Sequence, residues 1–103
     1  MNKGNTQPSP GLINPGTEYE QKRYAENGVC HITADYINFR NKPIVSNSNP
    51  ITGQYYKGEK VKYDLVVITN LYVWISWVSD STGERRYMTI TDKTTKEKWA
   101  YCV

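Results

Sequence analysis

Apolar and polar side chains alternate along most of the chain after residue 28, and this period of two predicts β-strands. In residues 60–68 every second side chain is apolar, and the row consists of Val61, Tyr63, Leu65 and Val67. The pattern stops at Thr69 and Asn70 and resumes over 72–78, which predicts a hairpin. Shorter alternating stretches predict further strands over 30–34, 37–39, 85–90 and 99–102, with a turn over 80–84. We therefore expect an all-β fold, a small barrel of about six to seven short antiparallel strands.

The first 28 residues follow neither the strand period nor the helix period, and Pro and Gly interrupt them repeatedly. This composition predicts a disordered or loosely ordered linker over 1–28 and a folded domain over 29–103. Acidic and basic side chains cancel within the linker, so the formal net charge of +3 belongs to the predicted domain.

Composition supports strands over helices, because eight Val, eight Ile and nine Tyr stand against three Leu and three Ala. A chain of 103 residues has room for one domain. No stretch approaches the roughly 18 apolar residues of a membrane span, and the opening MNKGNTQPSP lacks the apolar core of a signal peptide. We therefore expect a soluble chain without an export signal.

The chain offers little catalytic equipment. Cys30 and His31 are neighbours in a predicted strand, so their side chains point to opposite faces and cannot form a nucleophile and base pair. One His and two distant Cys do not supply the ligands of a zinc site, and no phosphate-binding Gly loop is present. We expect a protein that is not an enzyme and that uses no cofactor or metal.

Several aromatic side chains lie opposite the apolar rows of the predicted strands. Tyr72 and Trp74 oppose the row of Val73 and its alternate neighbours, and Tyr87 opposes Met88. Tyr36 and Asn38 oppose Ile37 in the same way, whereas Tyr63 and Trp77 belong to apolar rows and are expected inside. Outward aromatics either bind a ligand or pack in cross-strand pairs, and both readings stay open.

Two blocks resemble bacterial SH3 (SH3b) domains. These are INFRNKPIVSNSNPITGQYYKGEKVKYD over 37–64 and YVWISWVSDSTGERRYMTI over 72–90, in the order and spacing of the modules of phage endolysins and secreted bacteriolytic enzymes of Gram-positive hosts. The resemblance spans about residues 29–103 and departs from the common pattern at Asn41 and Lys42, where relatives carry Ser-Gly. It implies an SH3-like barrel.

The resemblance also implies a non-catalytic cell-wall-binding module of a phage endolysin. Its ligand would be peptidoglycan, through the interpeptide bridge or stem peptide, or a wall polysaccharide or teichoic acid. Full-length endolysin or copies of the module itself are further expected partners, and a membrane and nucleic acid are not. Such a protein would be made in the host cytoplasm and act at the bacterial cell wall.

Resemblance assigns Tyr87 and Trp99 to the ligand groove, with the polar residues Thr33 and Asp35. Together with the outward residues found by alternation, the expected ligand-binding set is Thr33, Asp35, Tyr36, Asn38, Tyr72, Trp74, Tyr87 and Trp99. Two alternatives remain: a basic barrel that binds single-stranded nucleic acid, and a peptide-binding SH3-like module.

The two cysteines lie near the ends of the predicted domain. In SH3-like barrels the first and last strands run close together, so a disulfide between Cys30 and Cys102 is conceivable. Against it, a protein made in a reducing cytosol usually keeps its thiols. We expect two buried free thiols, with the disulfide as the alternative.

Overall fold

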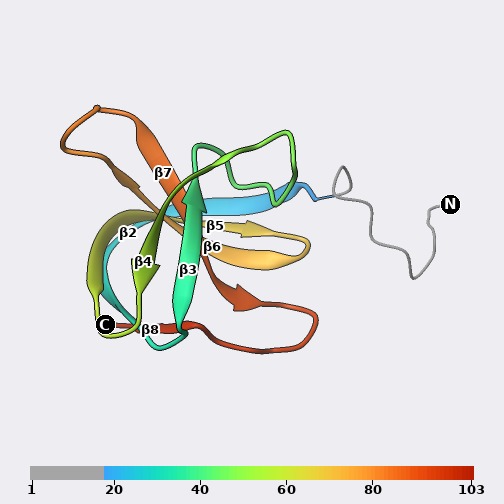
Figure 1. The fold of residues 1–103 in the computed structure, drawn as a ribbon. Coiled ribbons are helices and arrows are strands. Elements are labelled where there is room, and N and C mark those ends of the chain that lie inside the picture. The colour runs from blue at the N-terminus through green and yellow to red at the C-terminus, as the bar shows by residue number, and fades with distance from the viewer. Residues whose placement is uncertain (1–17) are drawn as a thin grey trace, which may run out of the picture.

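The computed structural model describes residues 18–103 and forms one antiparallel sheet of seven strands, with no helix in that range (Figure 1). The strands are β2 (Glu20–Ile32), β3 (Tyr36–Arg40), β4 (Ile51–Tyr56), β5 (Lys60–Thr69), β6 (Tyr72–Val78), β7 (Arg85–Asp92) and β8 (Ala100–Cys102). Their order across the sheet is β4-β3-β7-β6-β5-β2-β8. The expected all-β fold is confirmed.

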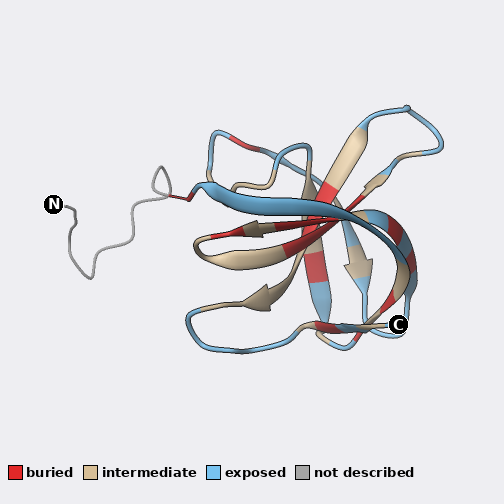
Figure 2. Cartoon of the chain, turned by 180° about the vertical axis from the view of Figure 1, so that it is seen from behind, coloured by how far each residue is buried: buried red, intermediate tan, exposed pale blue. Residues whose placement is uncertain are grey.

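The sheet curls around one main core. Buried apolar side chains from six of the seven strands meet in a single cluster: Cys30, Ile32, Ile37, Val61, Tyr63, Val66, Ile75, Met88 and Ala100. One flat sheet cannot bring the inner faces of so many strands together, so the strands must wrap around the cluster, as the buried segments in Figure 2 show. Tyr63, which is 6% exposed, confirms its expected inward position.

The predicted hairpins are present. In the β5–β6 hairpin, Leu65 pairs with Ser76 and Ile68 with Val73, and the Thr69 hydroxyl accepts hydrogen bonds from the backbone of the turn. The turn before β7 contains Gly83 at φ +75°, a left-handed backbone that Gly adopts without steric cost.

Strand β2 begins earlier than the sequence predicts. Residues 20–28, assigned above to the linker, pair with β5, with Glu20 opposite Thr69 and Ala25 opposite Leu65. Their side chains from Glu20 to Asn27 are all exposed, so no burial pattern marks this part of the strand in the sequence. Backbone pairing with the long β5 strand holds it in place. The rest of the expected linker, residues 1–17, lies outside the described residues.

The outer face of the sheet carries a second buried cluster, and this corrects two expectations. Trp74 is 1% exposed and Tyr87 is 8% exposed, although alternation placed both on the wet face. They pack with Val67, and the partly buried Val45 lies against them. Alternation correctly put Trp74 opposite Ile75, but both faces of β6 are covered at this point. Residue 45 belongs to the loop between β3 and β4, which contributes to that cover.

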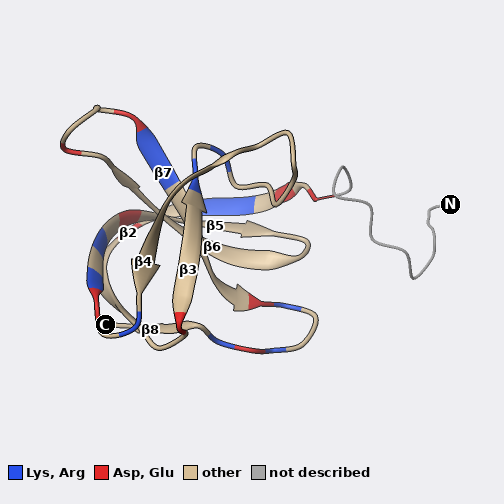
Figure 3. Ribbon diagram, viewed as in Figure 1, with Lys and Arg blue, Asp and Glu red and all other residues tan. Residues whose placement is uncertain are grey.

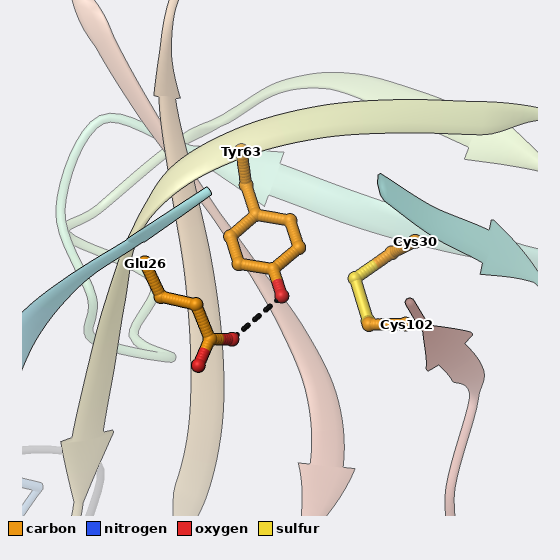
Figure 4. The surroundings of a disulfide bond; sticks show 4 residues. All are labelled: Glu26, Cys30, Tyr63 and Cys102. Carbon is orange, nitrogen blue, oxygen red and sulfur yellow. Dashed lines mark hydrogen bonds between the residues drawn. A yellow bond between two sulfur atoms is a disulfide. The ribbon is translucent and has the colours of Figure 1, made fainter. Parts of the chain in front are cut away.

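The expectation of two free thiols is wrong, because Cys30 and Cys102 form a disulfide between β2 and β8 (Figure 4). The two residues are direct partners in the β2–β8 register, and their Cα atoms are 3.9 Å apart. Their strand neighbours Ile32 and Ala100 belong to the same core cluster. Both strands therefore contribute to one core, and their pairing brings the two sulfur atoms together.

Tyr63 carries a polar group into the core region. Its hydroxyl donates a hydrogen bond of 2.7 Å to the Glu26 carboxylate, as Figure 4 shows. Burial, together with the nearby Glu26 charge, raises the pKa of Tyr63 to about 12. The folded protein thus keeps a proton here that an ordinary tyrosine loses at about pH 10.

We predict that this proton makes the fold sensitive to alkali. Between about pH 10 and pH 12 the unfolded chain releases the Tyr63 proton while the folded chain retains it, so stability falls as pH rises. The expected loss is about 2 kcal/mol, measured by urea denaturation at pH 9 and pH 12. Because other groups titrate in that range, the quantity compared is the difference between the wild type and Tyr63→Phe. Tyr101→Phe, at a site 57% exposed, is the control, and an equal pH dependence in all three proteins would contradict the prediction.

Candidate functional site

An open groove of about 510 Å³ lies where the segment before β3 meets β6 and the β7–β8 connection. Seven of the eight residues expected to bind a ligand line it: Thr33, Asp35, Tyr36, Asn38, Tyr72, Trp74 and Trp99. These residues are up to 66 positions apart in sequence, and the curled sheet brings them together. The eighth, Tyr87, is not among the lining residues; it packs in the second buried cluster beside Trp74, which does line the groove.

Backbone hydrogen bonds fix one corner of the groove. The Trp99 carbonyl accepts bonds from the amides of Thr33 and Ala34, at 2.9 and 3.1 Å, and the Trp99 amide donates to Ile90 at 2.9 Å. The β2–β3 connection and the residue that enters β8 are thereby tied to each other. The Trp99 ring, which is partly buried, is held at a fixed place in the groove wall.

The aromatic wall continues from Trp99 to β6. The Tyr72 ring lies 6.2 Å from the Trp99 ring and 6.1 Å from the Trp74 ring, the latter in an edge-to-face arrangement. Such arrangements stabilise aromatic side chains relative to one another. Burial, with smaller contributions from Asp92 and Glu18, raises the pKa of Tyr72.

Polar side chains complete the lining. Thr33, Asp35 and the 54%-exposed Tyr36 leave the groove open to water on one side. Two acidic residues, Asp35 and Glu97, and one basic residue, Arg40, line it. The groove is therefore aromatic and weakly acidic, in a protein whose formal net charge is +3.

Sequence reasoning missed part of the lining. The additional residues are Ala34, Ile37, Arg40, Val45, Thr89 and Glu97. Arg40 lies in the first of the two blocks on which the family resemblance rests and could have been included. Val45 and Glu97 lie in loops, where no period indicates which way a side chain points.

The described residues contain no grouping of His, Cys, Asp and Glu that could hold a metal ion. His31 stacks on the Tyr101 ring, with the ring centres 4.7 Å apart. Within residues 18–103, no helix is long and apolar enough to cross a membrane. Lys and Arg lie on β2, β3, β5 and β7 and in the connections that follow β3, β4 and β7, as the colouring of Figure 3 shows.

Comparison with protein families and solved structures adds to this geometry. Residues 19–90 match a family model described as bacterial SH3 domain. The fold is similar to that of Ly7917, with 33% sequence identity and a TM-score of 0.65 over 79% of this chain. The chain spans about a third, 34%, of the Ly7917 chain. No similar protein was found among curated sequences.

Two further similar structures are single domains. The cell wall binding domain of the Staphylococcal phage 2638A endolysin shares 29% identity and a TM-score of 0.65, over 85% of this chain and 96% of that one. The cell wall targeting domain of the peptidoglycan hydrolase ALE-1 shares 22% identity and a TM-score of 0.63, over 85% of this chain and 97% of that one. At that identity the second likeness concerns the fold alone.

Proposed function

The chain belongs to the bacterial SH3 domain family, and from this premise we propose that it is the cell-wall-binding module of a phage endolysin. Its matches are to binding domains, which are not catalytic. The module would dock the attached lytic enzyme onto Gram-positive peptidoglycan at the cell wall. The observation that carries the proposal is the groove in which Tyr72, Trp99 and the polar residues of the β2–β3 connection meet.

The groove suits a polar, flexible polymer such as peptidoglycan. Tyr and Trp rings cover short peptide segments or sugar faces, while phenol and indole groups still form hydrogen bonds. Tyrosine orders only two side-chain torsions on binding, so little entropy is lost for each contact. Because Trp99 is fixed by three backbone hydrogen bonds, its part of the wall is formed before the ligand arrives.

Charge favours this ligand over nucleic acid. Two carboxylates and one guanidinium line the groove, and the carboxylates of Asp35 and Glu97 would repel phosphates. Interpeptide bridges and stem peptides carry amide groups that such a lining can bind. Wall polysaccharide or teichoic acid is the alternative ligand on the same wall, and sacculi stripped of teichoic acid distinguish the two.

We predict that the fluorescently labelled chain binds Gram-positive cells and purified sacculi, and that Tyr72→Ala or Trp99→Ala lowers the affinity at least tenfold. Loss of an aromatic contact at the centre of a binding site typically costs about 2 kcal/mol. The matched control is Tyr101→Ala, which removes an exposed aromatic side chain outside the groove. If the wild-type chain bound none of the Gram-positive walls tested, the proposal would be refuted. If all three variants bound equally well, the groove would not be the binding site.

A further inference from the structure

Glu18 is a buried acidic residue at the point where the chain enters the described domain. It is 5% exposed, although it precedes the first strand and lies in the segment that the sequence assigned to the linker. A buried carboxylate is costly unless several donors satisfy it.

Three donors from three separate segments satisfy Glu18. Its Oε1 accepts a bond of 2.7 Å from the backbone amide of Val45, in the β3–β4 loop. Its Oε2 accepts a bond of 2.6 Å from the Thr69 hydroxyl at the end of β5, and one of 3.0 Å from the Trp74 indole nitrogen on β6. Bonds to a charged acceptor are stronger than bonds between neutral groups.

Two of the three donors belong to residues that line the groove, namely Val45 and Trp74, whereas Glu18 and Thr69 do not line it. Glu18 therefore contacts two residues of the groove wall without lining the groove itself. Because it joins the β3–β4 loop to β6, it fixes the distance between two parts of the lining that no strand pairing connects.

From this geometry we infer that Glu18 is a positioning residue of the groove, which holds Val45 and Trp74 in the arrangement that binds the wall ligand. The inference rests on the proposed function for its ligand, but the positioning itself concerns the free protein. Any coupling between Glu18 and the ligand is reciprocal, so a bound ligand also stabilises the hydrogen-bonded position of the Glu18 carboxylate. The functional module then includes Glu18, eleven residues before the expected start of the domain at residue 29.

The decisive variant is Glu18→Gln. An amide has only one acceptor oxygen, and its NH2 group would face either the Val45 amide or the donors on the other side. Whichever way the amide turns, one groove residue loses its partner. We expect the affinity for sacculi to fall roughly tenfold, a change within the usual range of coupling free energies between two positions that act on each other through the protein.

A second variant tests the inference in case Glu18→Gln does not fold. Thr69→Val removes the hydroxyl that donates to Oε2, and with it the acceptor of the Leu71 and Tyr72 amides in the turn, and we expect it to weaken binding several-fold. Thr69→Ser keeps the hydroxyl and is expected to bind like the wild type. The matched control is Glu20→Gln, two positions from Glu18, which removes an exposed carboxylate paired with Arg23 and is expected to leave binding unchanged.

Two measurements separate positioning from general stability. The first is the hydrogen exchange of the Val45 amide and of the Trp74 indole N–H, followed by NMR in the free protein. We expect at least one of the two to speed up tenfold or more in Glu18→Gln, and neither in Glu20→Gln. The second is binding to sacculi at about 20 °C below the melting temperature of each variant, where all molecules are folded.

Each outcome decides the inference. Faster exchange of at least one of the two groups together with weaker binding by the folded variant supports it. Unchanged exchange, unchanged affinity, or a loss of binding that only follows the folded fraction overturns it. If the wild-type chain binds no sacculi, the proposed function fails, while the exchange measurement still decides whether Glu18 positions Val45 or Trp74.

Discussion

Reduction of the Cys30–Cys102 disulfide is expected to lower the free energy of unfolding by about 4 kcal/mol. The bond joins residues 72 positions apart, so it closes nearly the whole described domain into one loop. In the chain-entropy view, such a link stabilises the fold by restricting the unfolded chain. For a domain of this size the change corresponds to a drop of about 20 °C in melting temperature.

The measurement is thermal unfolding with and without a phosphine reductant, accompanied by the mass of the alkylated protein to establish the redox state. The double variant Cys30→Ala and Cys102→Ala provides the control, because it should melt at the same temperature in both buffers. Equal melting temperatures for the oxidised and reduced wild type would contradict the prediction.

The disulfide also bears on the groove. Strand β8 has only three residues, and it pairs with β2 through Cys102, Tyr101 and Ala100. Trp99 enters the groove wall immediately before this strand. The disulfide anchors β8 from the other side, so reduction is expected to loosen the Trp99 side of the groove before it unfolds the sheet.

Much of the fold follows from side-chain alternation alone. Strands β6 and β7 each turn one alternating row toward the main core, and this period of two is plain in the sequence. In β5 the row changes sides after Asp64, because Val61, Tyr63 and Val66 belong to the main core whereas Val67 belongs to the second cluster. The start of β2 is not, because residues 20–27 expose both faces and their strand conformation comes from pairing with β5. A strand that is held only by backbone hydrogen bonds to its neighbour shows no alternation of apolar and polar side chains in the sequence.

The candidate site shows the same division. Seven of its residues were expected from alternation or resemblance, since strand ends and their facing side chains are local properties. Alternation tells which face a side chain occupies, but not whether another segment covers that face. Trp74 and Tyr87 were misjudged for that reason, and Glu18 was missed because its burial depends on Val45, Thr69 and Trp74, all distant in sequence.

The disulfide was misjudged for a different reason. Cys30 and Cys102 lie on strands far apart in sequence, and only the β2–β8 register shows that the two residues are direct partners at the edge of one core. An argument from the redox state of the cytosol then favoured free thiols. Register between the first and last strands is a long-range property that spacing cannot supply.

Trp74→Ala is expected to lower the free energy of unfolding by about 4 kcal/mol, the typical cost of removing a buried aromatic side chain. The ring is 1% exposed and packs with Val67 and Tyr87, so its loss leaves a cavity in the second cluster. It also removes one of the three donors of the buried Glu18 carboxylate.

Comparison with two other variants separates structure from binding at this position. Trp74→Phe keeps most of the packing and loses only the indole donor, so it should cost about 1–2 kcal/mol. Trp99→Ala removes a partly buried ring at the groove wall and should reduce binding with less effect on stability. Urea denaturation and sacculus binding measured on all three variants test this order. If Trp74→Ala proved as stable as Trp99→Ala, the second cluster would not stabilise the fold. Trp74 would then act only as a wall of the groove, as alternation first suggested.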